Sequence, residues 1–167
     1  MPTYDPATRD LLRLTLTPGL GPVLIARALE VFRSPAAVLS ANEAGLRRVR
    51  GIGDDRARSI VNAFVATDPA ADRELASAEQ FGVHLVPIHD PAYPPLLRQI
   101  PDAPPILYVR GQIEHAGEDR YPIAIVGSRS CTAYGVEQSE RFAMALAQAG
   151  LTVVSGGARG IDTAAHR

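Results

Sequence analysis

The first 67 residues combine short apolar stripes of helical spacing with breaks at proline and glycine. Asp5-Pro6 is a typical helix start, and leucines at helical spacing follow it through residue 16. Glycine turns interrupt the pattern at 17–22 and 50–55. Five short helices are expected, beginning near residues 6, 23, 35, 43 and 56. The two segments of helix, glycine turn and helix lie about 32 residues apart, which indicates an internal duplication.

A second pattern covers residues 68–111. Asp68-Pro69 predicts the start of a separate helix that ends near Gly82, and the apolar run at 83–88 predicts a strand. The proline density over 87–105 excludes a long helix or a central strand there. We expect an ordered, stiff connection with one short helix, followed by a strand at 105–109.

From residue 122 the pattern becomes that of an α/β protein. Continuous apolar runs at 122–126 and 151–155 are typical of strands covered on both faces. The segment 132–150 between them is amphipathic, with Thr132 suited to cap its start and Gly150 to end it. Strand, helix and strand in this order predict a βαβ unit with two parallel strands.

The two strands of such a unit end at the same edge of the sheet, where open α/β sheets bind ligands. The loops "GSRSC" (127–131) and "SGGARG" (155–160) leave that edge, and each leads to a helix N-terminus. Glycine amides and two arginines are what an anion site requires. The candidate phosphate-binding residues are Gly127, Ser128, Arg129, Ser155, Gly156, Gly157, Arg159 and Gly160. The alternative is a pair of tight turns with solvated arginines.

The helical region offers a second candidate site. "PGLG" and "RGIG" match the glycine turn of a helix-hairpin-helix motif, whose amides can hold a backbone phosphate without reading sequence. Accessory DNA contacts are predicted at Arg47, Arg48, Arg50, Gly51, Gly53, Arg56 and Arg58. Asp54 and Asp55 lie where a phosphate would approach, which weakens the prediction of DNA contact by this hairpin. The alternative is a helical module that binds protein.

Composition narrows the chemistry. All 17 basic residues are arginine, so lysine-based catalysis and a Walker lysine are excluded. One cysteine excludes an internal disulfide, and the four histidines lack ligand spacing, so neither a metal nor a cofactor is expected. No apolar stretch is long enough to span a membrane, and the N-terminus is unlike a signal peptide. A cytoplasmic protein is therefore expected.

Three segments together resemble the DNA-processing protein A family, also called DprA or Smf. They are "DPAYPPLLRQIPDAPPILYVRG" (90–111), "AIVGSRSCTAYG" (124–135) and "VVSGGARGIDTAAHR" (153–167). The resemblance implies a SAM-like helical domain over 1–67 and the first part of an extended Rossmann-like domain over 68–167. It also implies that Gly127, Ser128 and Arg129 form a DNA-binding loop. Asp162 and His166 match motif positions whose role the residues alone do not give.

The resemblance also implies a function. Members bind single-stranded DNA without known catalysis, protect DNA that enters during natural transformation and load the recombinase RecA. The full-length protein is expected to form a homodimer. Because the family's sheet continues beyond the second strand of this repeat, the sequence is expected to be a fragment. A nucleotide-binding phosphohydrolase and a protein-interaction scaffold are the alternatives.

Overall fold

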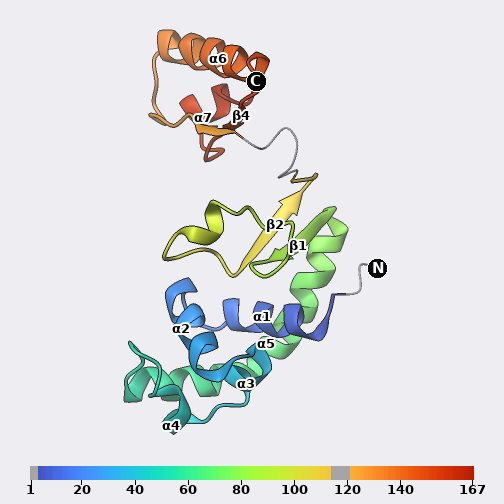
Figure 1. The fold of residues 1–167 in the computed structure, drawn as a ribbon, viewed down its shortest axis with the longest axis vertical. Coiled ribbons are helices and arrows are strands. Elements are labelled where there is room, and N and C mark those ends of the chain that lie inside the picture. Colours follow the sequence, from blue (N-terminus) through green and yellow to red (C-terminus); the bar gives the residue numbers. More distant parts are fainter. Residues whose placement is uncertain (1–3, 114–120) are drawn as a thin grey trace. The chain divides into compact units, whose positions relative to one another are not determined.

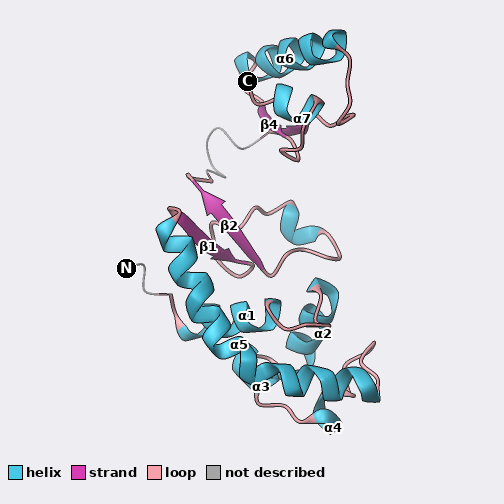
Figure 2. Ribbon diagram, turned by 180° about the vertical axis from the view of Figure 1, so that it is seen from behind, coloured by secondary structure: helices cyan, strands magenta, loops and turns pink. Residues whose placement is uncertain are grey.

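The computed structural model describes residues 4–113 and 121–167, and its contacts divide the chain into two units. Unit 1 comprises Met1–Gln112 and unit 2 comprises Ile113–Arg167. Both contain helices and strands, so the mixed α/β class expected from the sequence is confirmed (Figures 1 and 2). No helix within the described ranges has the length and hydropathy needed to cross a membrane.

Unit 1 begins with helices whose starts follow from local capping chemistry. They are α1 (Pro6–Thr15), α2 (Pro22–Phe32), α3 (Pro35–Leu39), α4 (Glu43–Leu46) and α5 (Asp54–Gln80). The Asp5 carboxylate accepts the Thr8 N–H at 2.6 Å, and Ser34 and Asn42 cap α3 and α4 in the same way. A proline opens each of α1, α2 and α3, where its missing N–H costs nothing.

The long helix α5 differs from the expected pattern. A new helix was predicted at Asp68-Pro69, but α5 runs without a break from Asp54 to Gln80 with Pro69 inside it. Pro69 cannot donate to the carbonyl of Val65, one turn earlier. Val65 is 82% exposed, so this turn faces water, which can satisfy that carbonyl. The boundary expected between residues 67 and 68 falls within α5, and the assignment of 1–67 and 68–167 as domains stays a prediction.

The core of unit 1 is one apolar cluster built around α1. This helix contacts α2, α3 and α5, and it buries Leu11, Leu12 and Leu14 almost completely. The cluster continues to Leu85 and Ile106 in the small sheet that follows α5. Helices and sheet therefore share a single core, which is why the chain does not divide at the end of the predicted helical region.

The sheet of unit 1 pairs β1 (Val83–Pro87) with β2 (Ile106–Arg110) in antiparallel register, Leu85 opposite Tyr108. The proline-rich segment connects them and contains a single 3₁₀ turn, η1 (Leu97–Gln99). Within it the Tyr93 hydroxyl donates to the Pro104 carbonyl at 2.8 Å, and Arg98 donates to the Asp90 carbonyl at 2.8 Å. The one short helix expected in this segment is present as the turn η1, and the stiffness of the connection stays a prediction.

Unit 2 has the predicted βαβ order. It contains β3 (Pro122–Ala124), α6 (Ala133–Gln148), β4 (Thr152–Val154) and α7 (Ile161–Ala164). The strands are parallel, with Ile123 opposite Val153. Thr132 caps α6 by accepting the Gly135 N–H at 3.2 Å, and Gly150 ends it in the left-handed region at φ 82°, as expected.

The strands of unit 2 are shorter and more exposed than their apolar sequences predict. The expectation that both faces are covered is wrong for the described residues, because Val126 and Val154 are exposed. The physical reason is that α6 and α7 are the helices of this part of the chain, and no further helix among residues 121–167 covers the strand ends.

Candidate nucleic-acid interface

The two loops that follow β3 and β4 lie against each other, as the βαβ order predicts. The Ile161 N–H donates to the Ser128 carbonyl at 3.2 Å. A Cβ built on Gly160 would lie 2.2 Å from the Ser128 carbonyl oxygen and 2.9 Å from Cα of Arg129. The backbones that carry Arg129 and Arg159 are therefore neighbours at one edge of the sheet.

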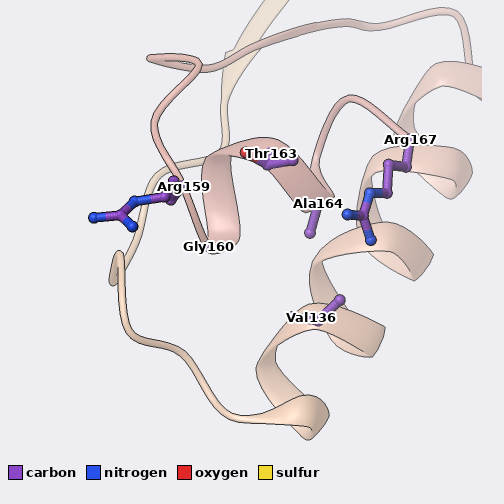
Figure 3. Close-up of a pocket in the computed structure, with 6 residues that line it drawn as sticks. All are labelled: Val136, Arg159, Gly160, Thr163, Ala164 and Arg167. Atoms are coloured by element: carbon purple, nitrogen blue, oxygen red, sulfur yellow. The ribbon is translucent and has the colours of Figure 1, made fainter.

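Both arginines are exposed at this edge. Neither makes an ion pair or a side-chain hydrogen bond with another described residue. Figure 3 shows the Arg159 side chain extending away from α6 and α7. Two permanent positive charges are thus available to an anionic ligand.

Three of the predicted site glycines have packing roles within unit 2. The place of a Cβ on Gly127 is filled by Ile161, that on Gly156 by an Asp162 oxygen at 2.8 Å, and that on Gly160 by the neighbouring loop. Gly157 differs, since its φ is 67° and nothing lies within 4 Å of the same position. The glycine pattern therefore reflects close contact between the loops, and only Gly157 is open on its outer side.

The predicted serines also differ in their free hydrogen-bonding capacity. The Ser155 hydroxyl donates inward to the Ile125 carbonyl at 2.7 Å. The Ser128 oxygen accepts the Ser130 N–H at 3.1 Å, which leaves its own O–H free to donate outward. Ser128 is the better suited of the two to contact a phosphate.

Asp162 is a component of the site that pattern reasoning left without a role. Its side chain lies inside unit 2, and its Oδ1 accepts the Gly127 N–H at 3.3 Å. This contact uses an amide that the sequence had offered to a phosphate. The signal in the sequence that could have suggested this role of Asp162 is an acidic residue at the second position of the helix that follows a glycine loop.

The helix N-termini at the two loops are unequal. The N-terminus of α6 begins a helix of 16 residues, whereas α7 has only four. The dipole expected at the start of the second helix is therefore small, because it sums over few peptide units. The full positive charge at the second loop is that of Arg159.

A shallow hollow of about 280 Å³ lies between α6 and α7 beside the second loop. Its lining residues are Val136, Arg159, Gly160, Thr163, Ala164 and Arg167 (Figure 3). Arg167 reaches over it and lies 3.5 Å from Glu140 on α6, while Arg159 points away from it. The free charge of Arg159 therefore faces outward and not into this hollow.

The second hairpin of unit 1 has the predicted backbone form. Gly51 has φ 100°, and Gly53 is the N-cap of α5 with no side-chain cap. Its arginines are largely engaged within the unit. Arg47 pairs with Asp54 at 2.5 Å, Arg58 lies 3.8 Å from Glu43, and Arg56 donates to the Gly51 carbonyl.

The carboxylates beside this hairpin oppose an anionic ligand. The hydrogen bond from Arg47 lowers the pKa of Asp54, so this acid stays ionised at the first position of α5. Asp55 follows it in the same turn. Arg48 and Arg50 are exposed, and their side chains have no ion pair among the described residues. DNA contact by this hairpin stays a prediction.

Comparison with known proteins gives matches for both parts of the chain. Residues 9–65 match the SAM-like helix-hairpin-helix tandem, and residues 84–167 match the family described as DNA recombination-mediator protein A. The chain is 33% identical to protein Smf of Synechocystis over 89% of its own length and 37% of that protein. It is 32% identical to the DNA processing protein DprA of Bacillus subtilis, over 66% of its length and 37% of that relative.

The fold is also that of a solved structure in this group. The X-ray structure of DNA processing protein A from Streptococcus pneumoniae matches 98% of the chain with a TM-score of 0.70 and 27% identity, and the match covers 53% of that protein. The chain thus spans between about a third and a half of these relatives. Because the family match covers half of the chain, the chain belongs to the DNA recombination-mediator protein A family, the DprA/Smf proteins.

Proposed function

We propose that this chain binds single-stranded DNA through the outer side of its two glycine loops, as part of DNA processing and recombination. The observation that carries the proposal is a pair of exposed arginines at adjoining loops, Arg129 and Arg159, which make no ion pair with any residue that the structure describes. A nucleic-acid strand is a row of phosphates, and guanidinium groups bind phosphate bidentately. Family membership supports the same substrate, and so do the names of the Bacillus subtilis and Streptococcus pneumoniae relatives, which are called DNA processing proteins.

A single strand fits this surface better than a duplex. The loops offer permanent charge with a free hydroxyl at Ser128, and Tyr134, which is 71% exposed, follows at the second position of α6. An exposed aromatic ring beside a phosphate site can stack on a base that is not paired. Duplex bases are already stacked on one another and would not offer that face.

We propose binding without catalysis. Asp162 is a buried acid beside the loops, and its Oδ1 already accepts the Gly127 N–H while its Oδ2 lies against Gly156, so it is poorly placed to act as a general base. Residues 4–113 and 121–167 contain no group of three or more His, Cys, Asp and Glu side chains that could hold a metal ion. A nucleotide phosphohydrolase is therefore the weaker alternative.

The wider role follows from the same proposal. We infer that the protein acts in the cytoplasm, where it would protect incoming DNA during transformation and load the recombinase RecA onto it. Family membership as a recombination mediator supports a recombinase partner. A homodimer of the full-length protein belongs to the same proposal.

The first prediction tests the loop arginines directly. Arg129→Ala should weaken binding to oligo-dT about tenfold, because one phosphate contact is lost, and it should reduce the slope of log affinity against log salt by about 0.7. Fluorescence anisotropy across a salt series measures both quantities. Arg141→Ala is the matched control, since Arg141 is an exposed arginine of the same unit on the third turn of α6. It should change the affinity by less than about twofold.

Three outcomes would count against the proposal. Equal effects of the two arginine variants would mean that only net charge matters. The absence of any binding to oligo-dT would favour the scaffold alternative. Nucleotide hydrolysis that Arg129→Ala abolishes would favour the phosphohydrolase.

A further inference from the structure

We propose that Asp162 is a positioning residue that ties the two glycine loops together and confines strand phosphates to their outer side. This inference rests on the proposed function for its DNA readout. Its structural part concerns contacts within unit 2 and can be tested without DNA.

One carboxylate faces both loops. Oδ1 of Asp162 accepts the Gly127 N–H, which leaves β3, at 3.3 Å. Oδ2 lies 2.8 Å from the point that a Cβ on Gly156 would occupy, so it rests against the loop that leaves β4. Asp162 as a whole residue is 7% exposed, which means that water does not compete strongly for these contacts.

Neighbouring contacts hold Asp162 in this position. The Ile161 N–H donates to the Ser128 carbonyl, and the Ser139 hydroxyl of α6 donates to the Ile161 carbonyl at 3.1 Å. The Thr163 hydroxyl donates to the Ala158 carbonyl at 2.7 Å. The residues on both sides of Asp162 are thus anchored to the first loop, to α6 and to the second loop.

The charge of Asp162 also selects the side on which a phosphate can bind. A phosphate placed between the loops would approach a buried carboxylate of the same sign and would find the Gly127 amide already used. The outer side instead offers Arg129, Arg159 and the open backbone at Gly157. Phosphates therefore bind outside, and Asp162 sets the spacing of the groups that bind them.

The test is a double-mutant cycle between positions 156 and 162. Asp162→Ala should weaken oligo-dT binding about tenfold, because the tie between the loops is lost. Asp162→Asn keeps an oxygen for the Gly127 N–H and removes the charge, so it should bind as tightly as wild type or up to about threefold tighter. Gly156→Ala should weaken binding alone, since its Cβ meets Oδ2, but should add nothing in the Asp162→Ala background.

Two further measurements complete the experiment. Hydrogen exchange at the Gly127 amide should accelerate in Asp162→Ala and stay slow in Asp162→Asn, whether or not DNA is present. Glu137→Ala is the matched control, because it removes an exposed acid from α6 of the same unit. It should leave the Gly127 amide unchanged.

The inference is overturned if the losses of affinity in Gly156→Ala and Asp162→Ala add up in the double variant. It is also overturned if Asp162→Asn loses as much affinity as Asp162→Ala. An unchanged Gly127 amide in Asp162→Ala overturns it even if that variant is partly unfolded elsewhere. Failure of the wild-type chain to bind oligo-dT would refute the proposed function, and the Gly127 exchange would still decide whether Asp162 ties the loops.

Discussion

At the scale of single residues, the glycines of the two loops differ in what replaces their missing side chains. Gly160 has φ 88° and lies against the backbone of Ser128 and Arg129, whereas Gly157 has φ 67° and open space around it. Position 160 requires glycine both for its positive φ and because a side chain would collide with the neighbouring loop. Position 157 requires glycine only for its positive φ.

This difference predicts that replacing each glycine by alanine lowers the stability of unit 2 by a different amount. Gly160→Ala should destabilise unit 2 by more than about 2 kcal/mol, because a Cβ would lie 2.2 Å from a backbone oxygen. Gly157→Ala should cost only about 1 kcal/mol, from backbone strain. Hydrogen exchange of the amides in β3 and β4 measures both costs, and equal protection in the two variants would contradict the packing described here.

The sequence could predict that glycines stand at these turns, because they follow apolar strands directly. It could not show that Asp162 and Ile161 fill the space beside Gly156 and Gly127. Gly156 and Asp162 are six positions apart in the sequence, and Gly127 and Ile161 are 34 positions apart. The local sequence does not determine which side chain fills the space beside a glycine. The adjacency of Arg129 and Arg159 was predictable, since parallel strands place their following loops together.

At the scale of secondary-structure elements, an ion-pair cluster joins α1 to α5 next to Pro69. Arg9 donates to Asp68 at 2.9 Å and to Asp72 at 2.8 Å, and Arg13 lies 3.4 Å from Asp68. Local signals at Asp68-Pro69 favour a helix start, yet α5 is continuous there. Packing against α1 and the contacts of both arginines stabilise a continuous helix that the local sequence at Asp68-Pro69 disfavours. Because these contacts come from residues distant in the sequence, the local pattern predicted a boundary at 67/68.

This cluster predicts a dependence of stability on pH. Hydrogen bonding to Arg9 lowers the pKa of Asp68 below its ordinary value of 3.8. A carboxylate with a lowered folded-state pKa stabilises the fold above pH 3.8, and this contribution is lost as the pH falls through the lowered value. The difference in melting temperature between wild type and Asp68→Asn should be largest at pH 7 and should shrink below pH 3.8.

Thermal melts followed by circular dichroism at pH 7 and at pH 2.5 measure that difference. Asp102→Asn provides the control, because Asp102 is exposed and has no ion pair among the described residues. A gap between wild type and Asp68→Asn that is the same at both pH values would show that the cluster contributes no ion-pair stability.

At the scale of the whole molecule, the two units divide core and candidate chemistry between them. Unit 1 buries a continuous apolar cluster that includes Leu12, Ile25 and Ile60. Among the described residues of unit 2, the buried side chains are small or polar, and Phe142 and Met144 of α6 are exposed. Unit 1, which has the larger core, carries the hairpin in which Arg47, Arg56 and Arg58 have partners. Unit 2 carries the loops whose arginines, Arg129 and Arg159, have no side-chain partner within 4–113 and 121–167.

This division predicts that DNA contacts the two loops of unit 2 and not the hairpin of unit 1. The most direct measurement is to follow the backbone amide resonances of the isotope-labelled chain by NMR as oligo-dT is added. We predict shifts at Ser128, Arg129, Gly157 and Arg159 that weaken as salt is raised, with little change at 47–58. Shifts confined to the hairpin at 47–58, or shifts at the loops that salt does not affect, would contradict the account.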